Sequence, residues 1–294
     1  MPALNLSGLQ IVIAGGDKRH LILAQELQAL GADIFLHGFS GVLNKNKLWQ
    51  LGLPVKADAI ILPITGVADD GTIPALEEAQ KINFLDLKAL LAAGMLVIGG
   101  KLPEKYLQEL HKRQVKYLAA HELAELAILN AIPTAEGALA FAINHADFTI
   151  FGSKVLITGY GRCAQPLARI MKALGANVTI IARKREALAA AKIEGFHCDD
   201  FKALQAHVKK ADFIFNTVPC LVLEKKVLSA APPHVLIVDI ASAPGGTDFA
   251  AAKEMGIKAY LLPGIPGKTA PVTAGKFLAG VYAEYLNLHL KGGI

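Results

Sequence analysis

The 294-residue chain is 53% hydrophobic and 19% charged, which predicts an ordered globular protein long enough for two domains, each with its own core. Its net charge of +5 comes from 24 Lys and 6 Arg residues, spread without runs or interleaved aromatic residues; this argues against a dedicated nucleic-acid surface but suits an anionic cofactor. No uninterrupted apolar run reaches the ~18 residues of a membrane span, and the first residues lack the basic region and apolar core of a signal peptide, so we expect a cytoplasmic protein without a membrane partner.

Strands and helices are expected to alternate through the first half of the chain. A strand at 9–14 ends in Gly15-Gly16-Asp17, and a helix follows at 18–30 with Leu21, Ala24, Leu27 and Leu30 on one stripe. Further strands are expected at 33–36, 58–62, 95–98 and 115–118. Strands separated by helices predict a parallel sheet with helices on both faces.

Two segments of the first half have special features. Residues 65–84, rich in Gly, Asp and Thr, form the longest stretch without periodicity, and a loop of this length often lines a functional cleft. Residues 121–131 and 134–146 are predicted to be two helices broken at Pro133, with Thr134 as the N-cap of the second and Glu136 in its first turn.

The second domain is expected to begin near Phe148. Its strands are predicted around 154–158, 177–182, 212–216, 235–239 and 257–262, with helices between them. A last helix, 273–290, carries Phe277, Val281, Tyr285 and Leu288 on one face and is expected to return to the first domain. Its apolar character suggests a homodimer or a higher oligomer.

The predicted fold is therefore α/β, with two doubly wound parallel-sheet (Rossmann-like) domains and an interdomain cleft. We expect residues 1–147, joined by the C-terminal helix 272–294, to form a Rossmann-like domain for substrate and partner. Residues 148–271 are expected to form the dinucleotide-binding Rossmann domain.

The most informative motif is Gly159-Tyr160-Gly161-Arg162-Cys163-Ala164. It follows one expected strand and opens a helix that runs to about Leu174, and this is the setting that a dinucleotide-binding loop requires. The first glycine permits the tight turn, the second admits a pyrophosphate, and the small Ala164 lets the helix pack on the strand.

The end of the next strand indicates which dinucleotide binds. An NAD site usually has Asp or Glu about 20 residues after the motif to hold the ribose 2′-hydroxyl. This chain has Ala182 there, followed by Arg183, Lys184 and Arg185. We predict a preference for NADP, whose 2′-phosphate these cations would bind; the alternative is a solvated basic start of a helix.

Other cofactor contacts are expected where later strands end, because ligands of a doubly wound sheet bind beyond its carboxyl edge. Asn216 and Thr217 are candidates for hydrogen bonds to ribose or phosphate, and Val218-Pro219 for packing on a ring face; the alternative is a strand that ends in a turn. Asp239 is either a ligand or the cap of the following loop. The last candidates, placed near the nicotinamide, are Ala241 and Ser242.

Some chemistry is disfavoured by what the sequence lacks. Dehydrogenases of 2-hydroxy acids with this architecture use an Arg after the fifth strand and a later His, but here the stretch reads Ile240-Ala-Ser-Ala-Pro and no His lies between His234 and His289. The three cysteines, Cys163, Cys198 and Cys220, are scattered and indicate neither a disulfide framework nor a metal site. No residue is identified as the catalytic acid or base.

Candidate substrate ligands lie mainly in the first domain. Asp17 and Arg19 begin a helix, whose N-terminus attracts anions, and Arg19 has the geometry to grip a carboxylate; the alternative is a plain turn with solvated charges. The remaining candidates are Asn130, Thr134, Glu136 and Lys268, the first three at the expected helix junction, where Pro133 and a helix cap are an equally good explanation.

These motifs together resemble the dipicolinate synthase A-subunit family over essentially the whole chain. The resemblance is carried by Gly15-Gly16-Asp17-x-Arg19, Asn130-Ala-Ile-Pro-Thr-Ala-Glu-Gly137, Gly159-Tyr-Gly-Arg162, Asp239-Ile-Ala-Ser242 and Leu262-Pro-Gly-Ile-Pro-Gly-Lys-Thr-Ala-Pro271. The Pro-Thr-Ala-Glu-Gly and Pro-Gly-x-Pro-Gly segments are its more specific parts.

The resemblance implies an NADP-dependent oxidation of a dihydrodipicolinate-level compound to pyridine-2,6-dicarboxylate during endospore formation, in the mother-cell cytoplasm. It also implies a hetero-oligomer in which the partner is a flavoprotein-like second polypeptide, the B subunit. A small dicarboxylate substrate would explain Lys18, Arg19 and Lys268. Two alternatives stay open: an NADP-linked reductase of another small carboxylate, and a non-catalytic NADP-binding scaffold.

Overall fold

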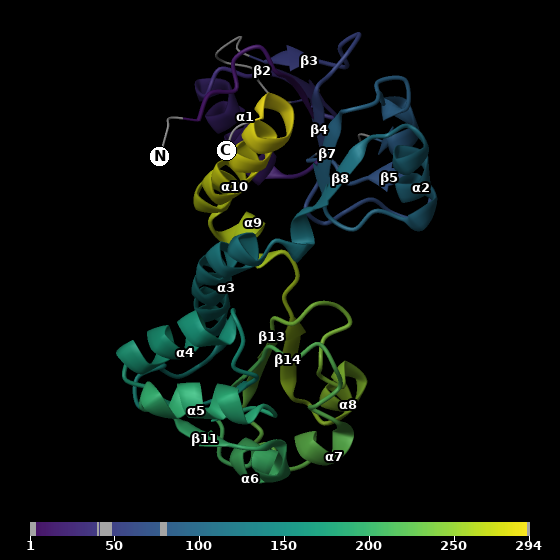
Figure 1. Ribbon diagram of the computed structural model, residues 1–294. Coiled ribbons are helices and arrows are strands. Elements are labelled where there is room, and N and C mark those ends of the chain that lie inside the picture. Colours follow the sequence, from purple (N-terminus) through teal and green to yellow (C-terminus); the bar gives the residue numbers. More distant parts are fainter. Residues whose placement is uncertain (1–3, 40, 42–48, 77–80, 293–294) are drawn as a thin grey trace. The chain divides into compact units, whose positions relative to one another are not determined.

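The computed structural model describes residues 4–39, 41, 49–76 and 81–292. They divide into two compact units (Figure 1): unit 1 comprises Met1–Leu129 and Ala270–Ile294, and unit 2 comprises Asn130–Thr269. The sequence placed the domain boundaries later, at 147/148 and 271/272. The first boundary differs because the second part of a long helix packs in the core of unit 2.

Unit 1 is built on a six-stranded parallel sheet of order β3-β2-β1-β4-β7-β8. The strands are β1 (Gln10–Ala14), β2 (Asp33–His37), β3 (Gln50–Leu51), β4 (Ala59–Ile61), β7 (Leu96–Gly99) and β8 (Lys116–Ala119). All five pairings between them are parallel. Because side chains alternate along a strand, Ile11 and Ile13 face one hydrophobic core and Val12 faces another.

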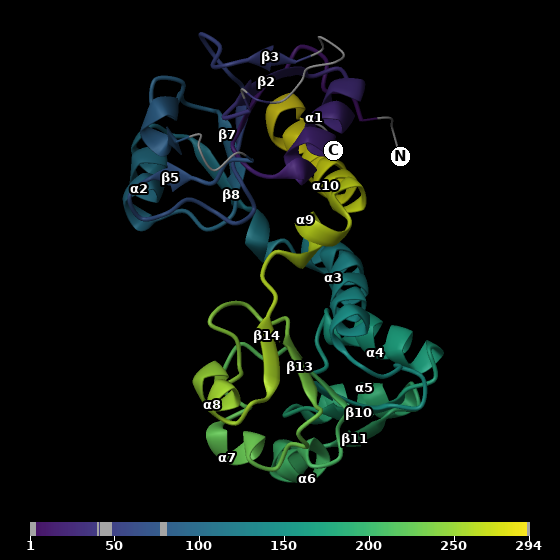
Figure 2. The ribbon, with the colours of Figure 1, turned by 180° about the vertical axis from the view of Figure 1, so that it is seen from behind.

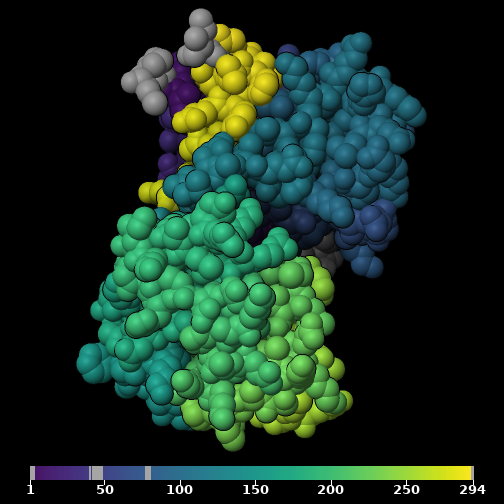
Figure 3. All heavy atoms as spheres, turned by 60° about the horizontal axis from the view of Figure 1, so that its bottom comes forward, coloured from purple at the N-terminus to yellow at the C-terminus, as the bar shows by residue number. Residues whose placement is uncertain are grey.

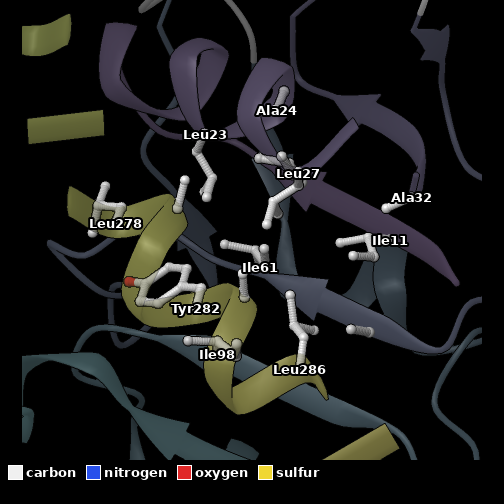
Figure 4. Packing of buried hydrophobic residues seen from close by; sticks show 14 of the residues in the cluster. Ile11, Leu23, Ala24, Leu27, Ala32, Ile61, Ile98, Leu278, Tyr282 and Leu286 are labelled. Carbon is white, nitrogen blue, oxygen red and sulfur yellow. The ribbon is translucent and has the colours of Figure 1, made fainter. Parts of the chain in front are cut away.

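The first core of unit 1 is covered by α1 (Lys18–Ala29) and α10 (Pro271–Lys291), as Figure 4 shows. The space-filling view in Figure 3 shows yellow C-terminal residues against purple N-terminal ones. The helices approach closely at Gly275, where an added Cβ would lie 2.6 Å from Ile22 Cβ. The opposite core is covered by α2 (Glu104–Lys112) and the 3-10 turn η1 (Phe84–Leu87).

The predicted helix faces need correction in both helices. In α1 the buried leucines are Leu23 and Leu27, whereas Leu21 and Leu30 are only partly buried. In α10 Val281 is buried as predicted, but the buried face also carries Leu278, Tyr282 and Leu286, and Leu288 is 51% exposed. Each helix is covered on more than one side, by the sheet and by the other helix, so its buried face is wider than one stripe.

The segment 65–84, expected to be a loop, contains a short antiparallel pair. Its strands are β5 (Thr72–Ile73) and β6 (Ile82–Asn83). Ile73 and Ile82 are buried against the second core of unit 1, which explains why so short a pair forms. Residues 77–80 of this segment lie outside the described part of the chain.

Unit 2 has a second six-stranded parallel sheet, of order β11-β10-β9-β12-β13-β14. Its strands are β9 (Lys154–Thr158), β10 (Asn177–Ile181), β11 (His197–Asp199), β12 (Phe213–Asn216), β13 (Leu236–Asp239) and β14 (Lys258–Leu261). Both sheets have the 3-2-1-4-5-6 order of dinucleotide-binding folds. The prediction of two doubly wound α/β domains is confirmed.

Helices cover both faces of the unit 2 sheet (Figure 2). On one face lie α4 (Ala164–Ala173), α5 (Arg185–Ile193) and part of α3 (Ala124–His145). On the other lie α6 (Leu204–Val208), α7 (Lys225–Leu228) and α8 (Phe249–Glu254). The strand β11 and the short helices α6 to α8 were not located individually in the sequence.

The predicted break at Pro133 is wrong, because α3 is one continuous helix with Pro133 inside it. Proline removes only one backbone hydrogen bond, to the carbonyl four residues back, and the cost of about 3 kcal/mol can be offset by packing. Here Ala135, Ala138 and Ala142 are buried in the core of unit 2. Thr134 is consequently not an N-cap: its hydroxyl donates to the Asn130 carbonyl at 2.6 Å.

Helix α3 is also the one described helix long and apolar enough to cross a membrane by length and composition alone. Core helices of soluble proteins pass the same test. Glu125 and Glu136 interrupt its apolar residues, and its alanine face packs in the core of unit 2.

Candidate dinucleotide site

The phosphate loop lies between β9 and α4, as its motif predicts. Gly159 has φ +89° and an added Cβ would lie 2.4 Å from Thr217 Oγ1, so only glycine fits there. At Gly161 a Cβ would meet nothing within 4 Å, which leaves the open space that an approaching pyrophosphate needs. Cys163 precedes α4 and provides no side-chain cap for its N-terminus, which is the end of a helix that attracts anions.

A cavity of about 870 Å³ opens beside this loop at the carboxyl edge of the unit 2 sheet. Its lining includes Ala182 and seven of the predicted cofactor-binding residues, namely Gly159, Tyr160, Gly161, Arg183, Lys184, Val218 and Pro219. Its other walls are Ala187, Phe201, Leu204, Cys220, Leu221, Val222, Glu224 and Val227. The volume and the largely apolar far wall suit an adenosine moiety.

The basic triplet is divided by the start of α5. Arg183 and Lys184 are exposed and line the cavity, whereas Arg185 is the first residue of the helix and does not line it. Neither Arg183 nor Lys184 has an ion-pair partner within the described ranges. Two of the three cations are therefore available to a phosphate in this cavity, while Arg185 fits the alternative of a solvated helix start.

Asn216 and Asp239 lie behind the cavity rather than in it. Both side chains are fully buried, and Asn216 Nδ2 donates to Asp239 Oδ1 at 2.9 Å. Thr158 Oγ1 in turn donates to Asn216 Oδ1 at 2.6 Å. The chain of contacts joins the carboxyl ends of β9, β12 and β13, so these residues hold the edge of the sheet together.

Asp239 is the cap of its own loop, which was one of its two predicted roles. Besides Asn216, its carboxylate accepts from the Ala241 amide at 3.1 Å, the Gly246 amide at 2.8 Å and the Thr247 hydroxyl at 2.8 Å. A buried carboxylate needs several donors of this kind to offset desolvation. Ala241 is buried and Ser242 is exposed, and neither lines the 870 Å³ cavity.

The loop residues Tyr160 and Cys163 are held as neutral groups. Burial raises the pKa of Tyr160 to about 12, and the nearby Glu194 carboxylate adds to the effect. Its ring packs edge-on against Phe196 at 6.0 Å. Burial also raises the pKa of the Cys163 thiol, which disfavours the reactive thiolate form of this cysteine.

Arg19 binds within its own helix, contrary to the prediction of a free carboxylate grip. The Arg19 side chain is 5% exposed, and its guanidinium donates to Asp17 from Nε at 2.9 Å and from Nη2 at 2.7 Å. Burial alone would raise the pKa of Asp17, but the hydrogen bonds and charges of His20 and Arg19 lower it far below its usual range. From the sequence, Asp17 and Arg19 are expected to be two separate ligands of the substrate, so their pairing with each other is not predicted.

Of the other predicted substrate residues, Asn130 and Thr134 share one face of α3, while Glu136 is exposed on another. Thr134 is 8% exposed and is already bonded to Asn130. Lys268 is exposed on α9 (Ile265–Thr269). The structure does not bring these residues together as one described cavity.

The two most specific sequence segments do meet within unit 2. At Gly137 of α3, an added Cβ would lie 2.3 Å from both Ile265 Cγ2 and Thr269 Oγ1 of α9. The glycine of the Pro-Thr-Ala-Glu-Gly segment is thus needed for close packing against α9, a helix that begins within the Pro-Gly-x-Pro-Gly segment at Ile265. Packing of α3 against α9 explains this part of the resemblance.

The apolar wall of the cavity was missed from the sequence. Phe201, Leu204, Leu221 and Val227 come from three separate segments that follow β11 and β12. Their position shortly after strands that end at the carboxyl edge of the sheet could have identified them as candidates from the sequence.

The fold and the phosphate loop define a dehydrogenase-type protein with a nucleotide-binding α/β domain and a second α/β domain. In agreement, residues 139–245 match the NAD-binding domain of D-isomer-specific 2-hydroxyacid dehydrogenases, and residues 10–120 match the N-terminal domain of the dipicolinate synthase A subunit. The chain is 38% identical over 292 residues to the dipicolinate synthase A subunit of Bacillus subtilis (strain 168), covering 96% of this chain and 97% of the relative. It belongs to the dipicolinate synthase A-subunit family.

Solved structures agree with this assignment. The crystal structure of the dipicolinate synthase A subunit from Bacillus halodurans superposes with a TM-score of 0.90 at 35% identity, over 96% of this chain and 99% of that one. The corresponding crystal structure from Bacillus subtilis gives a TM-score of 0.89 at 35% identity, over 99% of both chains.

Proposed function

We propose that this protein is the NADP-dependent subunit of a dipicolinate synthase, which oxidises a dihydrodipicolinate-level compound to pyridine-2,6-dicarboxylate during sporulation. Membership of the family supports the product. The observation that carries the proposal is the cavity beside the glycine loop, which is lined by Arg183 and Lys184. Residue 182, where an NAD site would have a carboxylate, is an alanine.

The residues of unit 2 fit the cofactor in three parts. The loop Gly159–Ala164 and the N-terminus of α4 would hold the pyrophosphate, with Arg162 exposed beside it. Arg183 and Lys184 would bind the 2′-phosphate, with Arg185 contributing charge from the start of α5. The apolar wall formed by residues such as Val218, Pro219 and Leu221 would pack on the adenine.

In the same proposal, several residues predicted to be ligands instead hold the strand ends and loops around the cofactor in place. Asn216, Thr217 and Asp239 hold the carboxyl ends of the strands, and Ala241 and Ser242 continue from that edge toward the nicotinamide. Asn130, Thr134, Glu136 and Lys268 stay as proposed substrate contacts.

The glycine loop and the cavity of unit 2 would hold NADP+, whose chemistry is to take up a hydride. The substrate then loses one hydride and one proton, and dihydrodipicolinate, NADP+ and base give dipicolinate, NADPH and the protonated base. Aromatisation of the ring supplies much of the driving force, so the protein mainly needs to orient the two reactants.

The family name also supports a second polypeptide in the enzyme. Each of the named relatives is described as the A subunit or A chain of a dipicolinate synthase. We infer that the partner here is a flavoprotein-like B subunit. The purified chain should form NADPH from dihydrodipicolinate, measured by NADPH absorbance with and without this partner. NADPH formation only with the partner would divide the work between the chains, and no formation in either case would leave an NADP-binding scaffold or a reductase of another carboxylate.

The cofactor assignment has a separate test. The variant Arg183→Asp should weaken NADP binding by about 1–3 kcal/mol, since a charge-assisted contact is lost and a repulsion is added. NAD binding should be unchanged or stronger. Titration calorimetry with both cofactors measures this, and equal losses for the two would contradict the assignment. The matched control is Arg185→Asp, the same charge change two residues on, which should cost less because Arg185 does not line the cavity.

A further inference from the structure

The cavity of unit 2 has an acidic lining residue that the fit to phosphate and ribose does not use. Glu224 is the one carboxylate among the lining residues that the structure describes. The cations Arg183 and Lys184 follow β10, whereas Glu224 lies in the segment that follows β12. Because a carboxylate repels phosphate groups, Glu224 is not a phosphate ligand and needs a separate explanation.

The backbone around Glu224 is held on both sides. The preceding Leu223 is fully buried, its amide donates to the Gly246 carbonyl at 2.9 Å, and its carbonyl accepts from the Asp248 amide at 3.0 Å. On the other side, the Glu224 carbonyl accepts from the Val227 amide at 2.8 Å as α7 begins. The Glu224 side chain therefore starts from a fixed point beside the cavity.

The Glu224 carboxylate is not used by the protein itself. It occupies the N-cap position of α7 but makes no side-chain cap hydrogen bond, and glutamate is not among the residue types preferred there. The neighbouring Lys225 pairs with Glu254 at 2.7 Å and not with Glu224. Within the described ranges the carboxylate has no hydrogen-bond or ion-pair partner. Its oxygens are available to a donor in the cavity, and a carboxylate can only accept.

The surroundings of Glu224 in the cavity are apolar. Val222 and Val227, close to it in the chain, both line the cavity. The first residue of α6 lines it too, and α6 is joined to α7 by a hydrogen bond from Gln205 Nε2 to the Lys226 carbonyl at 3.2 Å. Such walls suit a flat ring. In the adenine of a dinucleotide, the 6-amino group is the only N–H donor.

We propose that the Glu224 carboxylate accepts a hydrogen bond from the 6-amino group of the adenine and thereby selects adenine over a base with an oxygen at that position. The inference rests on the proposed function and deepens it, because it assigns a residue that recognises the nucleobase. Hypoxanthine has a carbonyl oxygen in place of the amino group, and two acceptors facing each other repel.

The test compares NADP with its deamino analogue, in which hypoxanthine replaces adenine, by titration calorimetry on the full-length chain. The wild type should bind NADP roughly three- to tenfold more tightly than the analogue, as expected for one exposed charge-assisted hydrogen bond. Glu224→Gln should lose this preference, because the amide can turn and donate to the ring oxygen. Glu224→Leu should lose it by binding NADP more weakly. Since the two dinucleotides carry the same charge, their affinity ratio isolates the contact with position 6 of the base.

The matched control is Glu186→Gln, which removes a carboxylate from the first turn of α5, outside the cavity lining. It should change the affinities for the two dinucleotides by the same factor and leave their ratio as in the wild type. Arg183→Asp should also leave this ratio unchanged, because it acts on the 2′-phosphate. Equal affinities of the wild type for the two dinucleotides, or the wild-type ratio retained in Glu224→Leu, would overturn the inference.

The same comparison with NAD and deamino-NAD separates the inference from the proposed function. A preference for NAD over deamino-NAD in a chain that does not bind NADP would support the role of Glu224 and count against the NADP assignment alone. Binding of neither NADP nor NAD would overturn both. Tight NADP binding without discrimination between adenine and hypoxanthine would count only against the role of Glu224.

Discussion

At the scale of single residues, the charged groups at the start of α1 stabilise the protein itself. Asp17 caps the helix, since its carboxylate accepts from the Arg19 amide at 3.0 Å, and it also binds the buried Arg19 guanidinium. Its backbone amide donates to His20 Nδ1 at 3.2 Å, which completes a capping box. One short segment thus satisfies a helix end and a buried cation together.

The variant Asp17→Asn should lower the free energy of unfolding by about 1–2 kcal/mol at neutral pH. Asparagine caps helices as well as aspartate does, so the loss reports the charge opposite Arg19, discounted for the partial exposure of Asp17. The measurement is urea unfolding of both proteins at several pH values.

The pH dependence of this difference follows from the lowered pKa of Asp17. A lowered folded-state pKa adds stability that is complete above the unfolded pKa of about 3.9 and is lost as the pH falls below it. The gap between the two proteins should therefore begin to shrink near about pH 5 and go on shrinking as the pH falls toward the lowered pKa of Asp17 in the folded state. The control Asp69→Asn removes an exposed carboxylate far along the chain from the start of α1 and should change stability little. A gap that is constant with pH would contradict the role of the charge.

Buried polar residues of unit 2 show the same principle. Asp239 accepts from four donors, and the amide of Asn216 connects it to Thr158. These side chains shape the edge on which a dinucleotide would lie, although they do not line the cavity. A buried polar residue at the end of a strand can therefore serve to hold the following loop in place and need not bind a ligand.

At the scale of elements, the contact between α1 and α10 carries the clearest steric constraint. At Gly275 an added Cβ would lie 2.7 Å from the Arg19 carbonyl oxygen, a backbone atom that cannot rotate away, as well as 2.6 Å from Ile22 Cβ. The same helix contains Gly280, where a Cβ would meet nothing within 4 Å and the residue is exposed. Position 275 therefore has no room for a side chain, whereas position 280 of the same helix can accept one.

Substituting these glycines should have effects of opposite sign. Gly275→Ala should destabilise the protein by roughly 1–3 kcal/mol, because overpacking forces the helices apart. Gly280→Ala should stabilise it by about 0.5–1 kcal/mol through the higher helix propensity of alanine. Thermal or urea unfolding of both variants gives the comparison, and a Gly275→Ala protein as stable as Gly280→Ala would show that α1 and α10 are not this close.

Helix α3 shows how packing overrides a local signal. Pro133 alone predicts a break, but alanines on the buried face continue through it at positions 135, 138 and 142. Small side chains allow the helix to lie close to the core of unit 2, and this burial offsets the lost hydrogen bond.

At the scale of the whole molecule, the chain contains two sheets of the same strand order. The glycine loop and the cavity lined by Arg183 and Lys184 belong to the sheet of unit 2. Under the proposed function, the dinucleotide would therefore bind to unit 2 and not to unit 1.

This division predicts where NADP should protect the backbone from hydrogen exchange. Adding NADP to the full-length chain should slow exchange most in the peptides that cover 158–164, 182–187 and 217–224, because these line the cavity or adjoin it. At about a hundredfold excess over Kd, NADP should also stabilise the protein by about 2.7 kcal/mol. Mass spectrometry of exchanged peptides measures the first effect. Protection concentrated at 15–20 in unit 1 would contradict the location.

The sequence by itself determined the α/β class, the glycine loop, the basic residues beside it and the family, because these depend on local periodicity, on glycine geometry and on linear motifs. Only the tertiary structure decided the partners of the polar residues. Arg19 is neutralised by Asp17, Asp239 is bound by donors up to 23 residues away, and α3 continues through Pro133 because of what it packs against. The walls of the unit 2 cavity come together for the same reason: neighbouring parallel strands end at one edge of the sheet, and that proximity has no signature in linear order.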